Sequence, residues 1–395
     1  MGHRSRNSNS AVRTVVVAFA FYFAVTVFAS RSAHAQSFEL VHSFAGGSDG
    51  GGPFAGLLTL DPGGNIYGTT TYGGAFGYGT LFRLNAEGDN TVLHAFTGGA
   101  DESKPYGGVI RDTEGNLYGT TSGGFDSGSP FGTVFKLAVT GKFTNLHAFG
   151  GGKDGAYPTG GLLEEADGNL YGVTDEGGEF GFGTVFEVSK AGKERILYSF
   201  HNQPDGQFPL YETLVMDSNR NLYGTTYAGG ALNQGTVFKV NAANGKEEIL
   251  YSFAGGEDGA LPYSGLLLDA DGNLYGTTSN GGGAGAGTIF RLSPTGKETL
   301  LYKFLGGTDG IFPLGSLVRD ANGDFYGTTT YGGANAEGTV YRLTGTGQEK
   351  LLHSFDWAEG INPFGGLVQD AAGNFYGTTA VGGAIGFGTV FKITP

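Results

Sequence analysis

One tetrapeptide, Tyr-Gly-Thr-Thr, recurs through the chain at a nearly constant spacing, and this repetition restricts the fold more than any other feature. The third copy has Val173 in place of the first threonine. The seven copies begin at Tyr67, Tyr118, Tyr171, Tyr223, Tyr275, Tyr326 and Tyr376, at intervals of 50 to 53 residues. A fixed period of this length indicates a repeat architecture, in which each unit is one supersecondary structure.

Each unit contains four short β-type runs. In the fifth unit they cover residues 263–268, 273–278 and 288–292, and the fourth runs from Glu298 to Phe304. Short runs separated by turn residues, without helical periodicity, indicate an all-β array. Four strands in about fifty residues suit a propeller blade better than a β-helix coil, which needs roughly half that length. We therefore predict a seven-bladed β-propeller with four antiparallel strands per blade.

The two ends of the repeat array predict how the ring closes. Residues 38–44 resemble the fourth run of a unit, whereas residues 388–393 resemble the third. If the first run of each unit is innermost, the N-terminal strand completes the last blade. Pairing between the chain ends removes the open sheet edges that invite aggregation. We expect the propeller to span residues 36–395.

Turn residues separate the first and second runs of most units. Asp61 and Asp269 each begin an Asp-x-x-Gly-Asn sequence, in which glycine supplies a positive φ and the aspartate bonds the turn backbone. Residues 269–273 also resemble the start of a calcium loop, but the distal glutamate that such a loop needs is missing. We interpret these sequences as hairpin turns.

The histidines and the lack of cysteine bear on metal binding. His42, His94, His147 and His353 occupy one position of the fourth run, which is tyrosine in the other units. Side chains on separate blades cannot converge on one ion, so we interpret them as structural. The chain has no cysteine, which excludes thiolate–zinc sites. We predict no metal site and no cofactor.

Residues 1–35 have the pattern of a secretory signal peptide. Arg4, Arg6 and Arg13 precede the uncharged segment 14–29, and residues 33–35 read Ala-His-Ala, a signal-peptidase pattern. The alternative is an uncleaved N-terminal anchor. No later segment is apolar enough to span a membrane. We predict a chain starting at Gln36 in the periplasm or outside the cell.

The charge of the predicted mature chain disfavours one class of partner. Residues 1–35 hold four of the 23 basic residues and none of the 37 acidic ones, which leaves a formal charge of −18. Such a surface repels phosphate backbones, so we expect no nucleic-acid partner. We expect a monomer.

The units resemble a known bacterial repeat. Gly-Asn-Leu-Tyr-Gly-Thr-Thr, then Gly-Gly, then Gly-Thr-Val-Phe-Lys-Leu, resemble the GloVer tandem repeat across residues 37–395. The resemblance implies an exported bacterial protein with a propeller-like fold and supplies no catalytic residues. Proteins of that kind have a choice of C-terminal anchors. This chain shows no such anchor, so we expect a released or periplasmic protein.

Acids and aromatic residues recur in the connections that should share one face of the propeller. An acid stands four residues before a proline in every connection between units, and exposed rings beside such acids are typical of sugar recognition. The predicted ligand-binding residues are Asp49, Asp101, Asp154, Asp205, Asp258, Asp309, Glu359, Tyr72 and Trp357. The alternative is that each acid caps its own turn.

The third and fourth units depart from the repeat. Asp175, Glu176, Glu179 and Glu212, with His201, could supply paired carboxylates for glycosidic chemistry or hold a cation. Drift in solvated loops explains the same residues. Our first hypothesis is a non-catalytic module that binds glycan or a cell-surface protein through this acidic, aromatic face. The alternative hypothesis is an extracellular polysaccharide hydrolase or lyase, and a purely structural envelope role is a third.

Overall fold

The computed structural model describes residues 1–2, 36–54, 56–123, 131–211 and 213–395. The chain divides into two units, Met1–His34 and Ala35–Pro395, and every strand lies in the second. The predicted signal peptide, residues 1–35, lies outside the described residues apart from its first two. Within the described part of the chain, no helix has the length and apolar character that a bilayer crossing requires.

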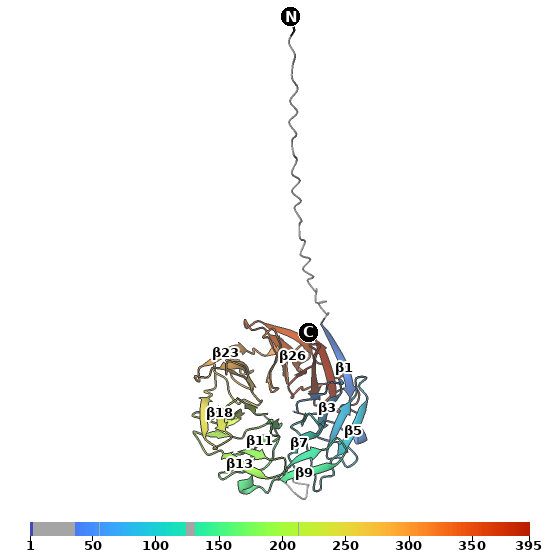
Figure 1. Ribbon diagram of the computed structural model, residues 1–395, viewed down its shortest axis with the longest axis vertical. Coiled ribbons are helices and arrows are strands. Elements are labelled where there is room, and N and C mark those ends of the chain that lie inside the picture. Colours follow the sequence, from blue (N-terminus) through green and yellow to red (C-terminus); the bar gives the residue numbers. More distant parts are fainter. Residues whose placement is uncertain (3–35, 55, 124–130, 212) are drawn as a thin grey trace. The chain divides into compact units, whose positions relative to one another are not determined.

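Seven four-stranded antiparallel sheets surround a common axis, which confirms the predicted propeller (Figure 1). The innermost strands are β2 (Thr59–Leu60), β6 (Val109–Arg111), β10 (Leu163–Glu164), β15 (Val215–Met216), β20 (Leu267–Leu268), β24 (Val318–Arg319) and β28 (Val368–Gln369). The second strands are β3 (Ile66–Thr70), β7 (Leu117–Thr121), β11 (Leu170–Thr174), β16 (Asn221–Thr226), β21 (Leu274–Thr278), β25 (Phe325–Thr329) and β29 (Phe375–Thr379).

The two outer positions of each sheet complete the blades. The third strands are β4 (Thr80–Leu84), β8 (Thr133–Leu137), β12 (Thr184–Val188), β18 (Thr236–Asn241), β22 (Thr288–Leu292), β26 (Thr339–Leu343) and β30 (Thr389–Thr394). The fourth strands are β5 (Asn90–Ala95), β9 (Phe143–Ala148), β13 (Glu194–Ser199), β19 (Glu247–Ser252), β23 (Glu298–Lys303), β27 (Glu349–Ser354) and, from the N-terminal end, β1 (Ser37–Ser43). Short elements decorate the loops: β14 (Gly206–Gln207) pairs with β17 (Ala228–Gly229), and three 3-10 helices are η1 (Gly47–Asp49), η2 (Gly152–Asp154) and η3 (Gly307–Asp309).

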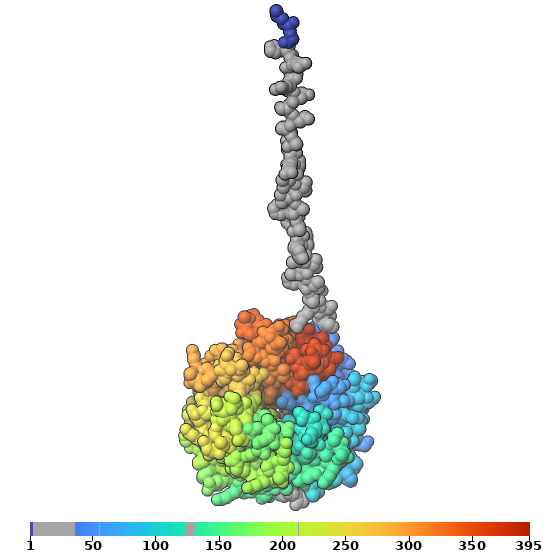
Figure 2. Space-filling view, viewed as in Figure 1, coloured from blue at the N-terminus to red at the C-terminus, as the bar shows by residue number. Residues whose placement is uncertain are grey.

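The ring closes as the sequence predicted. Strand β1 is the outermost strand of the last blade and pairs antiparallel with β30, from Ser37 opposite Thr394 to Ser43 opposite Thr389. Figure 2 accordingly shows the blue start of the propeller beside its red end. The outer edge of β30 is therefore covered by backbone pairing, without a disulfide.

The innermost strands are shorter than predicted. The run expected over 263–268 forms a ladder only at Leu267–Leu268. The residues before it approach the axis, where Tyr263 joins side chains from other blades around one cavity. Seven inner strands converge there, so these residues pack by side chain across the axis instead of extending the sheet.

The hydrophobic core lies between the blades. Seven clusters of buried side chains each join one blade to the next. The cluster between the last and first blades contains Phe44 and Val390 from one side and Ile66, Phe82 and Leu84 from the other. The closing interface is thus buried in the same way as the six others.

Three of the four residues of Tyr-Gly-Thr-Thr have a clear packing role. In the fifth blade the Tyr275 hydroxyl donates a hydrogen bond to Asp269 in the preceding turn, at 2.9 Å. A Cβ atom at Gly276 would lie 2.7 Å from the ring of Phe290, so only glycine leaves room for that buried phenylalanine. The Thr278 hydroxyl bonds the Thr288 hydroxyl across two strands, at 2.7 Å. The same threonine pair recurs in all seven blades.

The Asp-x-x-Gly-Asn sequences form the predicted hairpin turns. Asp61 accepts hydrogen bonds from the backbone N–H groups of Gly63 and Asn65 and from the Tyr67 hydroxyl. Burial opposes ionisation there, but these hydrogen bonds prevail and lower the pKa of Asp61. The aspartate thus holds its own turn.

Candidate functional site

The seven acids that were predicted to bind ligand lie at the loops that connect consecutive blades. Each carboxylate contacts the histidine or tyrosine of the fourth strand that precedes it. The pairs are His42–Asp49 (3.3 Å), His94–Asp101 (2.9 Å), His147–Asp154 (3.2 Å), Tyr198–Asp205 (2.8 Å), Tyr251–Asp258 (2.7 Å), Tyr302–Asp309 (3.1 Å) and His353–Glu359 (2.8 Å). The four histidines therefore belong to four different blades, and each contacts the acid of the loop that follows its strand.

Backbone groups of the same loops also bond these acids. Asp205, for example, accepts hydrogen bonds from the N–H groups of His201 and Gly206, both at 2.7 Å. In five other loops the acid accepts a comparable bond from the backbone N–H group four residues before it. This is the geometry of a loop cap. A ligand-binding role for these acids stays a prediction.

A second carboxyl from the next blade faces four of these loop acids. Glu194, Glu247, Glu298 and Glu349 each begin a fourth strand, and each has an Oε1 atom that is inaccessible to solvent and has no hydrogen-bond partner. Burial, and then the loop acids Asp154, Asp205 and Asp258, raise the pKa of Glu194, Glu247 and Glu298 to about 7. Burial and Asp309 also raise the pKa of Glu349. No pattern in the sequence had indicated these pairs.

The unusual acids of the third and fourth units do not form one cluster. Asp175 is buried, whereas Glu176 and Glu179 are exposed, and Glu179 lies 3.7 Å from Lys153. His201 packs against the ring of Phe180 with a centroid distance of 4.0 Å. Glu212 lies outside the described residues. Of this group, Asp175 alone is buried among the aromatic residues near the axis.

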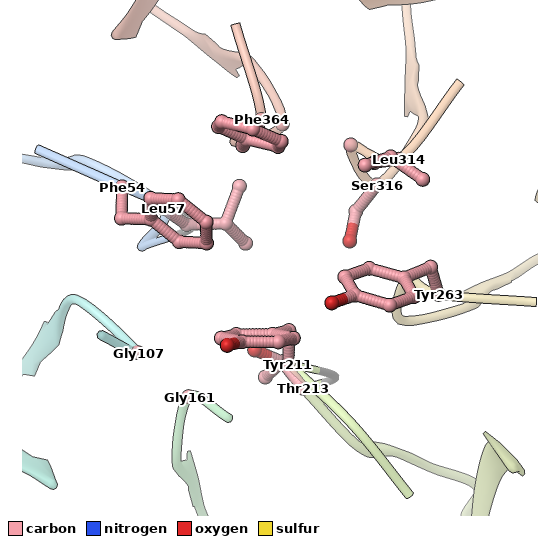
Figure 3. Close-up of a pocket in the computed structure, with 12 residues that line it drawn as sticks. Phe54, Leu57, Gly107, Gly161, Tyr211, Thr213, Tyr263, Leu314, Ser316 and Phe364 are labelled. Atoms are coloured by element: carbon pink, nitrogen blue, oxygen red, sulfur yellow. The ribbon is translucent and has the colours of Figure 1, made fainter. Parts of the chain in front are cut away.

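Five aromatic side chains meet at the propeller axis, on the face that carries the loops between blades. This axial aromatic site consists of Phe54, Tyr106, Tyr211, Tyr263 and Phe364, which come from five different blades. Phe54 stacks on Phe364 (4.4 Å between centroids), Tyr211 stacks on Tyr263 (5.2 Å), and Tyr106 contacts both Phe54 (5.5 Å) and Tyr211 (5.7 Å). Figure 3 shows four of these rings around the axis, with Leu314 and Ser316 opposite. All five are half-buried.

The cavity beneath these rings is small. Its volume is about 10 Å³, and its lining also includes Leu57, Thr213 and Ser316. That is roughly the space one water molecule needs. A ligand of the axial aromatic site would therefore rest on the rings and not sink into the channel.

In the third blade a polar pair, Thr159 and Asp175, takes the place of an axial aromatic side chain. Thr159 stands where other blades place an aromatic side chain after the loop proline, and its hydroxyl donates to Asp175 at 2.7 Å. The backbone N–H of Tyr211 donates to the same hydroxyl oxygen at 3.1 Å. Burial raises the pKa of Asp175 well above its usual value. Burial, with Asp175 and neighbouring tyrosines, also raises the pKa of Tyr106 and Tyr263 to about 12.

Exposed apolar side chains gather on the same loop face. Tyr72 and Trp357, both predicted to bind ligand, are each 55% exposed. Other large exposed apolar residues lie in the loops between second and third strands or in the loops between blades: Phe76, Phe180, Leu232, Leu305, Tyr331, Ile385 and Phe387. Elsewhere on the described propeller only Leu40, Val139 and Leu351 belong to this class. The loop face is thus the apolar face.

The axial residues carry a sequence signal, although they were not among the predicted ligand-binding residues. An aromatic residue directly follows the loop proline in Pro53-Phe54, Pro105-Tyr106, Pro262-Tyr263 and Pro363-Phe364. The position begins the approach to the innermost strand, so these side chains had to meet at the axis of any closed ring. Tyr211 departs by one residue from this register and would not have been found.

Comparisons with known proteins give a family and a fold. A family model described as the Gloeobacter/Verrucomicrobia repeat matches residues 24–164, 58–270, 125–318 and 256–395. No curated protein matches the sequence.

Solved structures share the architecture at low identity. The extracellular domain of a hybrid two component system from B. thetaiotaomicron has a TM-score of 0.59 and 15% identity and covers 91% of this chain, which spans only 39% of that one. An oligogalacturonate lyase in complex with manganese has a TM-score of 0.58 and 13% identity, covering 87% of this chain and 89% of its own. The periplasmic gluconolactonase of Pseudomonas aeruginosa has a TM-score of 0.54 and 15% identity, covering 83% and 99%. Identities this low show the fold alone.

Proposed function

We propose, from the premise that this chain belongs to the Gloeobacter/Verrucomicrobia repeat family, that it is an exported propeller which binds glycan without chemical turnover. The observation that carries this proposal is the axial aromatic site. Five half-buried rings from five blades form one platform on the apolar loop face. The extracellular domain among the similar folds is consistent with an exported protein.

The chemistry of the platform suits carbohydrate. Aromatic faces stack on the apolar C–H faces of sugar rings, and phenol hydroxyls exchange hydrogen bonds with sugar hydroxyls. Three of the five rings are tyrosines, so stacking and hydrogen bonding come from the same side chains. The raised pKa values of Tyr106 and Tyr263 keep their hydroxyls protonated at every physiological pH. Tyr72 and Trp357 add exposed rings on the same loop face.

The shallow cavity favours binding over catalysis. A polysaccharide hydrolase must enclose the scissile bond between two carboxyl groups about 5 to 9.5 Å apart. Asp175 is the carboxyl at the axial aromatic site, and Glu176 and Glu179 are exposed. The described residues thus offer one buried acid there.

An enzyme acting on polysaccharide is the second candidate, and Asp175 favours it. Burial raises the pKa of Asp175, and a carboxyl that holds its proton to a higher pH than usual can act as a general acid. An oligogalacturonate lyase is among the similar folds, and that likeness extends to the fold only. Under this candidate Asp175 would protonate a leaving group, with Glu176, Glu179 or Glu212 as its partner.

One experiment separates the two candidates. The protein is passed over a panel of immobilised polysaccharides, with retention and released products both measured. We expect retention on at least one glycan, no released product, and about tenfold weaker retention for Tyr263→Ala, the loss of about 1.4 kcal/mol of stacking. Phe180→Ala, which removes an exposed ring that is not part of the axial aromatic site, should be retained like the wild type.

The outcomes that contradict the proposal are distinct. Product release that Asp175→Asn abolishes would establish the enzyme instead. Retention that Tyr263→Ala leaves unchanged would move the site elsewhere. Tyr263→Phe keeps the ring and removes only the hydroxyl. If Tyr263→Ala is poorly retained, the retention of Tyr263→Phe shows whether the ring itself is required. Retention on a cell-surface protein, and on no glycan, would mean that the ligand is a protein instead of a glycan.

A further inference from the structure

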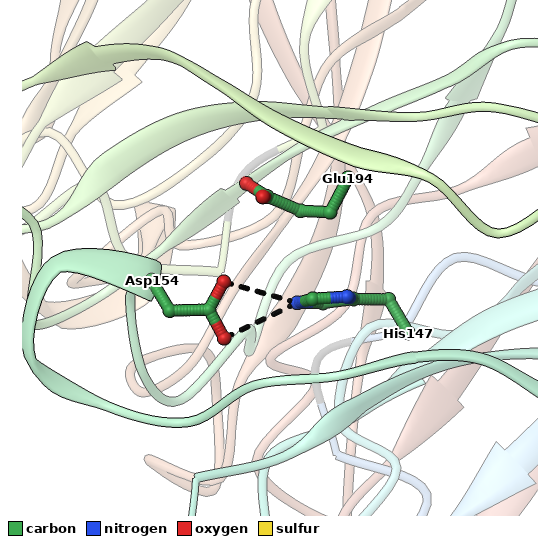
Figure 4. Close-up of side chains that lie close together, drawn as sticks. All are labelled: His147, Asp154 and Glu194. Atoms are coloured by element: carbon green, nitrogen blue, oxygen red, sulfur yellow. Dashed lines mark hydrogen bonds and ion pairs between the residues drawn. The ribbon is translucent and has the colours of Figure 1, made fainter.

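Three side chains of types that can bind a metal lie together at the interface between the second and third blades, outside the axial aromatic site. The imidazole of His147 faces Asp154 of η2. Its Nε2 atom lies 3.2 Å from Oδ1 and 3.3 Å from Oδ2 of that aspartate. Glu194, from the start of β13 in the next blade, faces the same point (Figure 4). One ligand atom from each residue can be chosen so that all three lie within 4.8 Å of one another.

The two carboxyl groups leave this site short of positive charge. The Oε1 atom of Glu194 is inaccessible to solvent and has no hydrogen-bond partner. A buried carboxylate beside a second carboxylate is unfavourable unless a proton or a cation joins it. At the next three interfaces the same pairing occurs, Glu247 with Asp205, Glu298 with Asp258 and Glu349 with Asp309, and there the fourth-strand residue is tyrosine.

The interface between the second and third blades differs from these three because its fourth-strand residue is a histidine. A tyrosine hydroxyl donates its proton to the loop acid and is a poor metal ligand at neutral pH, whereas a neutral imidazole offers a nitrogen lone pair. The other three histidines of this position lack the second carboxylate. Asn90 contacts Asp49 beside His42, and a phenylalanine ring stacks on His94 (Phe143) and on His353 (Phe38). Among the described residues, only His147 combines both features.

We propose that His147, Asp154 and Glu194 bind a divalent transition-metal ion of the zinc class across this blade interface. Histidine nitrogen and carboxylate oxygen bind Zn²⁺ at about 2.0 to 2.2 Å, so two ligands of a tetrahedral ion stand roughly 3.3 Å apart. The His147–Asp154 separation already matches that value. Glu194 presents a carboxylate oxygen within 4.8 Å of both other ligand atoms, so its closer approach to a bound ion would complete a set of three.

The site has the access and the donor set that zinc needs. The side chains of His147 and Asp154 are 18% and 29% exposed, so an ion can enter from solvent. One nitrogen and two carboxylates suit zinc better than calcium, which takes six to eight oxygen ligands. The fourth position would hold water. An ion there would join the loop after the second blade to the outer strand of the third.

Calorimetric titration of tag-free, chelator-treated protein with ZnCl₂ at pH 7.5 tests this site. We expect one equivalent to bind to the wild type, and at least about tenfold weaker binding for both His147→Tyr and Glu194→Gln, as befits the loss of a ligand. His147→Tyr recreates the tyrosine of the neighbouring interfaces, so it should fold normally. His94→Tyr makes the same exchange at an interface without the second carboxylate and should bind like the wild type.

Two results would overturn the proposal. The first is the absence of stoichiometric binding to the wild type, which would mean that a shared proton alone satisfies the carboxyl pair. The second is binding that His147→Tyr leaves unchanged, with its circular dichroism spectrum equal to that of the wild type. Because the axial aromatic site lies on other residues, neither result bears on glycan binding.

Discussion

Glu247→Gln should stabilise the propeller at alkaline pH and leave it nearly unchanged at mildly acidic pH. Glu247 faces Asp205, whose oxygens already accept hydrogen bonds from Tyr198, His201 and Gly206. Burial, followed by the charge of Asp205, raises the pKa of Glu247 from 4.5 to about 7. Its ionised form therefore opposes folding.

The sign and size follow from proton linkage. A carboxyl with a higher pKa in the folded state takes up a proton on folding, so its stabilising effect is present below pH 4.5, declines up to about pH 7 and is absent above it. The rise in pKa corresponds to about 3 kcal/mol at most. Partial exposure reduces this to about 1–2 kcal/mol. Glutamine cannot ionise, so the variant should gain that amount at pH 8.

Urea unfolding of wild type and variant at pH 5 and pH 8 measures the effect. Glu248→Gln is the control, because Glu248 is the adjacent residue and points to Lys239, at 2.5 Å, instead of a carboxylate. The hydrogen bond from Lys239 lowers the pKa of Glu248, so this variant should lose stability at pH 8. Equal or lower stability of Glu247→Gln at pH 8 would refute the reasoning.

Three further experiments test the packing and the processing of the chain. Gly276→Ala should cost about 1–3 kcal/mol in urea unfolding, because its Cβ would collide with the Phe290 ring, whereas Gly345→Ala, with its nearest atom at 3.6 Å, should cost little. Tyr275→Phe should cost about 1 kcal/mol, since it removes the hydroxyl that donates to Asp269; no loss would mean that this turn does not need the bond. N-terminal sequencing of the exported protein should begin at Gln36, and a retained Met1 would contradict the predicted cleavage.

Much of the fold could be predicted from the sequence because each blade repeats the same local chemistry. Asp61 and its equivalents mark the turns, and the Tyr-Gly-Thr-Thr strands mark the second position of every sheet. Closure could also be predicted, since the chain begins with a fourth strand and ends with a third. The turns and the repeated strands depend on residues close together in the chain, and closure depends on which strand type stands at each end of the repeat array.

The functional residues were harder to predict because they meet across blades. Glu194 and Asp154 belong to different units, and their contact depends on how two blades pack. The axial rings converge from five units, and no single repeat shows that they meet. Asp175 was singled out as an unusual acid, but its burial beside Tyr106 and Tyr211 follows only from the closed ring. The loop acids were easier to find because each is bonded within its own unit.

Closure of the ring by β1 and β30 underlies the axial site and every blade interface, and a designed disulfide tests it directly. Glu39 and Lys392 are opposite each other in this ladder, and their side chains form an ion pair at 3.1 Å. The chain has no cysteine, so a Glu39→Cys, Lys392→Cys variant has one possible disulfide within a molecule. We expect mass spectrometry to find this intramolecular bond formed rapidly and nearly completely under mild oxidation. Free thiols, or bonds only between molecules, would show that the two ends of the chain do not pair.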